Sequence, residues 1–171
     1  MSWPRQRDGV SCGPSVAVMA CALLDSDYGA PLRSPDSQMW FDAEQARVHR
    51  AINVVWPHRL GASPAGVARA MTAHSASRGV RYRWRPARCA DRLSDVCDAV
   101  AAGWPVAMAI GGTVIPRHWV LLTEIDGAVM RCYEPSSGDV LDIPIDDIRC
   151  GRLSRLGFPR AFAFVVPRLA R

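Results

Sequence analysis

The fold of this chain is decided at residues 11–15, Ser11-Cys12-Gly13-Pro14-Ser15, and at the apolar pattern that follows them. The apolar positions are Val16, Met19, Ala20, Leu23 and Leu24. Their spacing is that of one face of an α-helix. Ser11 is the expected N-cap, and Pro14 falls in the first turn, where the helix needs no N–H from it. The stretch therefore predicts a helix that begins beside Cys12.

Cys12 lies at the entrance of this predicted helix, a position that favours thiol chemistry. Backbone N–H groups and the positive end of the helix dipole stabilise a thiolate, which is the reactive form of cysteine. Gly13 removes a side chain beside the thiol, so that backbone or substrate can come close. The competing interpretation is a small buried hydrophobe, which is the common fate of a free cysteine.

A nucleophilic cysteine needs a base, and the histidines of the chain are His49, His58, His74 and His118. His118 opens a β-favouring apolar run over 119–125, and the turn signal Asp126-Gly127 follows it. The return run, 128–133, ends at Glu134. His118 is therefore the candidate base, and Glu134 the acid that could orient it.

The register of this hairpin decides whether Glu134 can reach His118. With a two-residue Asp126-Gly127 loop, His118 pairs with Pro135 and Glu134 points to the other face. A three-residue loop over 125–127, with a left-handed Gly127 in a bulge, pairs His118 directly with Glu134. We predict the three-residue loop, and a two-residue turn would argue against Glu134.

The chain resembles the papain-like cysteine peptidases, and more narrowly the branch that contains the bacteriocin-leader (double-glycine) processing peptidases and their stand-alone relatives. The residues that carry the resemblance are Gln6, Ser11-Cys12-Gly13-Pro14, Ala102-Gly103-Trp104-Pro105-Val106, His118-Trp119-Val120 and the acidic residue before Pro135. Their order and spacing cover most of the chain. The resemblance implies an α+β, papain-like fold in a single domain over residues 1–171. A helical half, about 1–103, would pack on an antiparallel β-rich half, about 104–171, with the active site in the cleft between them.

The resemblance also implies a role for each candidate residue. Cys12 would be the nucleophile and His118 its general base and acid. Gln6 and the backbone N–H of Cys12 would form the oxyanion hole. Glu134 would orient the imidazole. The family usually has Asp or Asn before the proline, so Glu134 is a departure from its pattern.

The hydrophobic periodicity predicts helices first and strands afterwards, with no internal repeat. Beyond the first helix, helices are expected within 38–56, over 65–73 with Ser63 as N-cap and Pro64 at its start, and from 91 or 94 to 102. Strands are expected at 105–110, 119–125, 128–133, about 139–143 and 161–166.

Composition is that of a folded globular protein. Of 171 residues, 49% are hydrophobic and 22% charged. No apolar run is long enough for a membrane span, and the N-terminus lacks a signal-peptide core, so a cytoplasmic location is the default expectation. Export, or delivery as part of a larger protein, remains open. All 21 basic side chains are arginine, which excludes lysine Schiff-base chemistry.

The six cysteines predict neither a disulfide framework nor a metal site. They lie at 12, 21, 89, 97, 132 and 150, without a Cys-x-x-Cys pair or zinc-ligand spacing. We therefore expect no cofactor and no metal, and Cys21 and Cys132 are expected to be packing residues.

The segment 78–88 alternates arginines with apolar and aromatic side chains. The alternation places Val80, Tyr82 and Trp84 on one face of a half-buried strand and Arg81, Arg83 and Arg85 on a solvated face. This interpretation is favoured over nucleic-acid binding by arginines and aromatics. A net charge of +5 still allows an acidic partner.

Three functions remain open from sequence. The first is a cysteine peptidase that acts on a peptide or isopeptide bond of a protein or peptide substrate. The second is a bacterial effector or toxin domain that uses the same thiol for glutamine deamidation or transglutamination. The third is a non-catalytic, arginine-rich binding module. The substrate, a parent polypeptide or cognate inhibitor, and the oligomeric state are not specified by the sequence.

Overall fold

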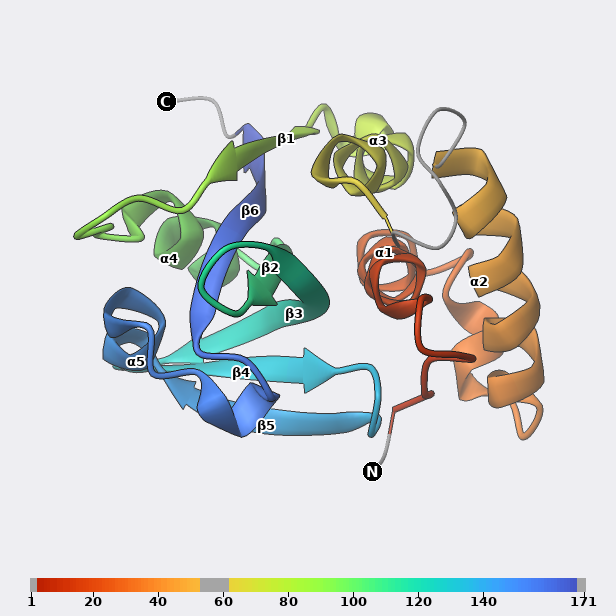
Figure 1. Ribbon diagram of the computed structural model, residues 1–171. Coiled ribbons are helices and arrows are strands. Elements are labelled where there is room, and N and C mark those ends of the chain that lie inside the picture. Colours follow the sequence, from red (N-terminus) through yellow and green to blue (C-terminus); the bar gives the residue numbers. More distant parts are fainter. Residues whose placement is uncertain (1–2, 53–61, 169–171) are drawn as a thin grey trace.

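A six-stranded antiparallel sheet organises the computed structural model, which describes residues 3–52 and 62–168 (Figure 1). The strands are β1 (Arg81–Pro86), β2 (Val106–Gly111), β3 (Pro116–Asp126), β4 (Val129–Glu134), β5 (Asp139–Pro144) and β6 (Arg160–Arg168). Their order across the sheet is β1-β6-β2-β3-β4-β5. The helices are α1 (Cys12–Leu24), α2 (Ser37–Ile52), α3 (Pro64–Ser75), α4 (Ser94–Ala101) and α5 (Ile145–Cys150). Short 3₁₀ turns lie at η1 (Ala30–Arg33), η3 (Ala76–Arg78) and η4 (Ser154–Leu156).

The predicted α+β class is confirmed, since N-terminal helices pack against an antiparallel sheet. The order of elements is less simple than helices followed by strands. β1 lies within the first 103 residues and forms an edge of the sheet beside β6, the last strand of the chain. The part of the second helix expected beyond residue 52 falls outside the described residues. The N-cap at Ser63 is confirmed, because its hydroxyl accepts from the Gly66 N–H at 3.1 Å.

Helix α1 is buried on nearly every side. Twelve of its thirteen residues are buried, and Leu23 is the exception at 46% exposed. The predicted single apolar face, which included Leu23, is therefore wrong. α1 contacts α2 and α3 as well as β2 and β3, and a helix enclosed in this way is apolar all round. This burial fixes α1, and with it the position of Cys12, against the sheet.

The β3–β4 hairpin differs from the prediction in its turn. Asp126 pairs with Val129, so Gly127 and Ala128 form a two-residue turn, and the predicted three-residue loop is wrong. Gly127 is left-handed, with φ of 54°. The bulge lies further along β3, where Glu124 pairs with Arg131 and Leu122 pairs with Cys132, leaving Thr123 as the extra residue.

This bulge places His118 and Glu134 on the same face of the sheet, which the two-residue turn alone would not do. Because side chains alternate along a strand, one extra residue in β3 moves every preceding side chain to the opposite face relative to β4. Beyond Thr123, Leu122 faces the same side as Cys132, and therefore His118 shares a face with Glu134. The β-bulge at Thr123 does what the predicted turn was expected to do.

The alternation predicted for β1 fails at its second half. Tyr82 is buried as expected, but Trp84 is 49% exposed and Arg85 only 8% exposed. The Arg85 guanidinium lies 2.6 Å from a carboxylate oxygen of Asp91 and 2.7 Å from one of Asp95, which belong to the loop and helix next along the chain. Burial of Arg85 is thus balanced by two acids, which the alternation of side chains cannot reveal.

We expect Arg85→Met to lower the free energy of unfolding by about 3 kcal/mol, because Asp91 and Asp95 would remain partly buried without a counter-ion. Urea denaturation measures this change. The matched control is Arg83→Met on the same strand, where an exposed guanidinium is removed and the change should stay within about 0.5 kcal/mol. Equal losses in the two variants would contradict a structural role for the Arg85 cluster.

Candidate active site

Cys12 is the first residue of α1 and is 6% exposed. The expected cap residue, Ser11, occupies the N-cap position, but its hydroxyl is turned away from the helix. That hydroxyl donates to the carbonyl of Asp8 and accepts from the Asp8 N–H, each at 3.0 Å. The side chain of Ser11 thus secures the preceding loop and leaves the N–H groups of the first helical turn without a side-chain cap.

Gly13 is required by packing beside the thiol. A Cβ at this position would lie 2.5 Å from Cβ of Ala62 and 3.1 Å from Cδ1 of Trp119. Trp119 is itself held by Ala62, whose carbonyl accepts from the indole N–H at 3.2 Å. Glycine therefore lets α1 begin directly against β3, where the neighbour of Trp119 is His118.

His118, the candidate base, lies beside Cys12. Its Nε2 lies 2.6 Å from Oε1 of Glu134, and the imidazole lies near enough to the Cys12 thiol for the thiol to raise its pKa. With Nε2 engaged by Glu134, Nδ1 is the nitrogen left to face the thiol. Burial disfavours the charged ring, but the hydrogen bonds to Cys12 and Glu134 and their charges outweigh it and raise the pKa of His118 to about 9.

Glu134 ends β4 and is held by the turn that follows it. Its Oε1 accepts from the backbone N–H of Ser136 at 3.0 Å, and its Oε2 accepts from that of Ser137 at 2.9 Å. Burial alone would raise the pKa of this carboxyl, but the hydrogen bonds from His118 and the two turn N–H groups lower it to about 2. Glu134 thus both begins the Ser136-Ser137-Gly138 turn and contacts the imidazole.

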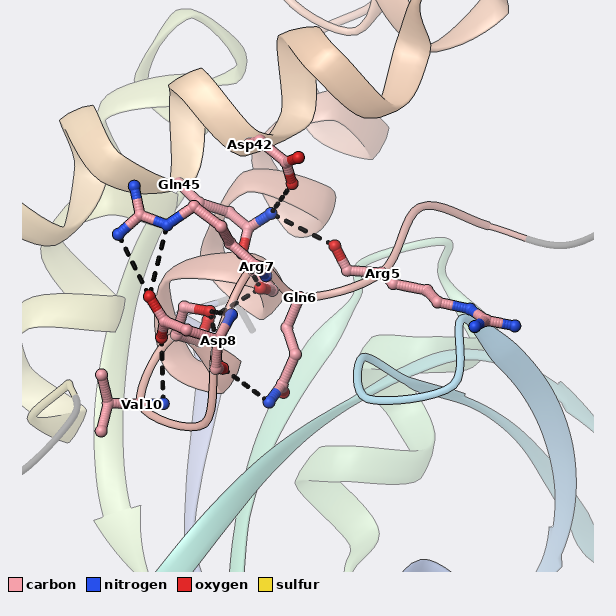
Figure 2. Close-up of polar contacts among 9 residues, drawn as sticks. Arg5, Gln6, Arg7, Asp8, Val10, Asp42 and Gln45 are labelled. Carbon is pink, nitrogen blue, oxygen red and sulfur yellow. Dashed lines mark hydrogen bonds and ion pairs between the residues drawn. The ribbon is translucent and has the colours of Figure 1, made fainter.

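Gln6 lies beside the same turn. Its backbone N–H donates to the Pro135 carbonyl at 2.7 Å, and its side-chain Oε1 accepts from the Ser136 hydroxyl at 3.3 Å. Its Nε2 donates to the Asp8 carbonyl at 2.8 Å, as Figure 2 shows. A primary amide carries two N–H donors, so this bond leaves one donor of Gln6 available.

The remaining histidines lie elsewhere. His74 pairs with Asp25 at 3.1 Å, and its ring lies 4.2 Å from that of Tyr28, between centroids. His49 is buried within α2. His58 lies outside the described residues. Of the candidates whose positions are described, His118 is the one that the fold places at Cys12.

The other cysteines differ in burial, and Cys97 is of intermediate exposure. Cys21 and Cys132 are buried, which raises the pKa of each thiol, and both are packing residues as predicted. Cys89 and Cys150 are exposed. All six thiols are free.

Within residues 3–52 and 62–168, no group of His, Cys, Asp and Glu side chains could hold a metal ion. No helix in that part of the chain is both long and apolar enough to span a bilayer.

Phe158 is a neighbour of the site that the sequence did not reveal. Its ring centroid lies 6.2 Å from that of His118. It stands in the loop before β6, whose Ala161 pairs with Ile110 of β2, and Ile110 pairs in turn with His118. Only the pairing of three strands brings Phe158 to the imidazole, and no local pattern encodes that pairing.

No protein-family model matches this sequence, and no curated protein does either. Solved structures do match over nearly the whole chain. A double glycine motif protease from an AMS/PCAT transporter, solved in complex with the leader peptide, matches with a TM-score of 0.54 and 15% identity, over 97% of this chain and 89% of that one. The peptidase domain of Streptococcus ComA, a bifunctional ABC transporter involved in quorum sensing, has a TM-score of 0.53 and 15% identity, over 98% of both chains. The Pseudomonas avirulence protein AvrPphB has a TM-score of 0.53 and 11% identity, over 99% of this chain and 97% of that one.

These matches confirm the predicted papain-like α+β fold and the structural likeness to double-glycine motif peptidases. Identities of 11% to 15% carry the fold and nothing finer.

We expect Glu134→Gln to lower the pKa of His118 from about 9 toward its ordinary 6.5, because the substitution removes the negative charge beside Nε2. An NMR titration of the imidazole measures the midpoint. Asp25→Asn is the matched control, since it neutralises the carboxylate that pairs with His74 and should leave the His118 midpoint unchanged. A midpoint that stays near 9 in Glu134→Gln would mean that Glu134 does not stabilise the imidazolium.

Proposed function

We propose that this protein is a papain-like cysteine peptidase that cleaves a peptide or isopeptide bond through an acyl-enzyme on Cys12. The observation that carries the proposal is the hydrogen bond between the Glu134 carboxylate and His118, whose imidazole lies near enough to the Cys12 thiol for the thiol to raise its pKa. A thiol at a helix N-terminus, an imidazole and a carboxylate in this order make up the activated nucleophile of acyl transfer.

Each step uses a group that the site supplies. The thiolate of Cys12 attacks the carbonyl carbon, and the oxyanion is stabilised by the Cys12 N–H and the second amide donor of Gln6. The tetrahedral intermediate collapses to a thioester as His118 gives its proton to the leaving amine. Water, deprotonated by His118, then attacks the thioester and releases the acid and the thiolate.

The electrostatics of the pair suit this sequence of proton transfers. With a pKa of about 9, His118 is protonated at neutral pH and can serve as the acid for the leaving amine. With a pKa of about 2, Glu134 stays ionised and keeps Nε2 protonated and oriented. The carboxylate thereby directs Nδ1 toward Cys12 throughout the cycle.

The first substrates to test are peptides. One of the similar structures holds a leader peptide and is named for a double glycine motif, so the proposed substrate is a peptide cut after two glycines. The same thioester could form on a glutamine side chain with loss of ammonia, and ammonia release is therefore measured alongside cleavage.

The first test is selective alkylation of Cys12. In a Cys89→Ser/Cys150→Ser background, which removes the exposed thiols, iodoacetamide at pH 6 should label Cys12 and leave the buried Cys21 and Cys132 unmodified. His118→Ala should slow this labelling by about 100-fold, since an unassisted thiol is mostly protonated at pH 6. His74→Ala is the matched control and should label at the parental rate. Peptide mapping by mass spectrometry gives the rates.

The second part of the test is turnover. A peptide containing Gly-Gly should be cleaved after the second glycine, and Cys12→Ala should abolish the cleavage. Ammonia release without chain cleavage would show that the protein is a deamidase and not a peptidase. Cys12 labelling that is slow at pH 6 and indifferent to His118→Ala would refute the proposal.

A further inference from the structure

The N-terminal strap, residues 3–8, lies between the Glu134 turn and helix α2. On the turn side, the Trp3 N–H donates to the Gly138 carbonyl at 3.0 Å and the Gln6 N–H donates to the Pro135 carbonyl at 2.7 Å. The strap is further held by the Tyr133 hydroxyl, which donates to the Pro4 carbonyl at 2.7 Å. These bonds tie the strap to the strand and turn that carry Glu134.

On the α2 side the strap meets Gln45, a polar residue that is only 1% exposed (Figure 2). Its Oε1 accepts from the Arg7 N–H at 2.9 Å, and its Nε2 donates to the Arg5 carbonyl at 3.3 Å. Gln45 therefore hydrogen-bonds to the strap one residue before and one residue after Gln6. A buried amide gripping both neighbours restricts rotation of the Gln6 backbone.

The orientation of the Gln45 amide is dictated by its partners. The Arg7 N–H needs an acceptor, whereas the Arg5 carbonyl and the Asp42 carboxylate, 3.3 Å from Nε2, need donors. A flipped amide would oppose all three. Gln45 thus has a single arrangement that satisfies both of its ends.

Gln45 also reaches the helix of the nucleophile. The Ser15 hydroxyl lies 2.6 Å from Oε1 of Gln45 and 2.7 Å from the carbonyl of Ser11. It has one proton and can give it to either oxygen. Ser15 is three residues after Cys12 in α1, so one buried side chain joins the Gln6 strap to the start of the nucleophile helix.

We propose that Gln45 is a positioning residue for the oxyanion hole: it holds Gln6, through Arg5 and Arg7, in register with the Cys12 N–H at the start of α1. This inference rests on the proposed function, because Gln6 needs a fixed distance from Cys12 only if both stabilise one oxyanion. Donors preorganised at the oxyanion position account for a large part of acyl-transfer rates, so a strap free to shift loses this stabilisation.

Gln38 supplies the contrast within the same helix. It also bonds Arg5, accepting from its N–H at 2.9 Å and donating to its carbonyl at 3.0 Å. Gln38 is exposed, and its bonds reach neither Arg7 nor Ser15. The same substitution at Gln38 and Gln45 therefore separates general support of the strap from positioning of Gln6.

The experiment compares two reactions of Cys12 in the full chain with the Cys89→Ser/Cys150→Ser background. Iodoacetamide alkylation displaces iodide and forms no oxyanion. The peptide aldehyde acetyl-glycyl-glycinal adds the thiol S–H across its carbonyl, which forms an S–C bond and places the resulting oxygen at the oxyanion position. Protection of Cys12 from iodoacetamide gives the aldehyde dissociation constant.

We expect Gln6→Ala and Gln45→Met each to weaken aldehyde binding by about 10-fold or more, because both impair one oxyanion donor. The double variant should bind no more than about 3-fold more weakly than Gln6→Ala, since the two side chains act as a unit. Alkylation rates should stay within about 2-fold of the parent in all variants, and Gln38→Met should leave the aldehyde affinity within the same margin. Gln45→Glu, which keeps the acceptor for Arg7 but loses the donors, is the second variant should Gln45→Met fail to fold.

Losses that multiply in the double variant would overturn the inference, as would a Gln45→Met alkylation rate that falls together with the aldehyde affinity. Each would mean that Gln45 acts on Cys12 or on the whole fold instead of on Gln6. If iodoacetamide labels Cys12 but the aldehyde does not protect it, the chain has no oxyanion site, and the inference is wrong. A Cys12 that labels slowly and independently of His118 would instead refute the proposed function.

Discussion

The 2.6 Å hydrogen bond between Nε2 of His118 and Oε1 of Glu134 is the interaction on which the rest of the site depends. It joins the start of β3 to the end of β4, and His118 then contacts the first residue of α1. Much of the remaining contact between α1 and the sheet is apolar packing, which tolerates small shifts. A hydrogen bond of this length does not, so the bulge at Thr123, the turn after Glu134 and the glycine after Cys12 all serve to keep it.

Keeping two ionised groups largely out of water is costly unless their remaining bonding positions are filled. The side chains of His118 and Glu134 are 10% and 12% exposed. The turn N–H groups of Ser136 and Ser137 occupy two further lone-pair positions of the carboxylate. The pair is therefore stabilised by backbone N–H donors, which do not titrate.

The two shifted groups also set the pH range in which the pair stabilises the fold. The folded pKa of Glu134 is lowered to about 2 from 4.5, so its contribution is complete above 4.5 and is lost as pH falls through 2. The folded pKa of His118 is raised to about 9 from 6.5, so its contribution is complete below 6.5 and is lost as pH rises through 9. Both contributions are complete only between 4.5 and 6.5, and the proposed catalysis near neutrality uses the upper flank of that range.

Sequence predicted those parts of the site that local patterns encode, and the structure shows why the rest escaped. A helix beginning at Cys12 and a strand beginning near His118 follow from periodicity. Arg85 and Gln45 were hidden, because a polar residue on a strand or helix reads as solvent-facing until the elements that bury it are placed. The turn of the hairpin was predicted wrongly, but His118 and Glu134 were correctly predicted to share a face of the sheet. Which face a side chain lies on changes with every one-residue shift in register, so a two-residue shift leaves it the same.

That difference in register gives a physical reason for glutamate at position 134. Beyond the bulge, the last pair of β3 and β4 is Leu121 with Tyr133, so His118 and Glu134 are offset by two residues along the strands and are not direct partners. Glu134 is then the diagonal neighbour of His118, and diagonal Cβ atoms are about 7 Å apart, against about 5 Å for direct partners. Aspartate or asparagine suits direct partners, whereas the diagonal distance needs one more methylene. The length of the glutamate side chain thus fits the strand pairing that places it beside His118.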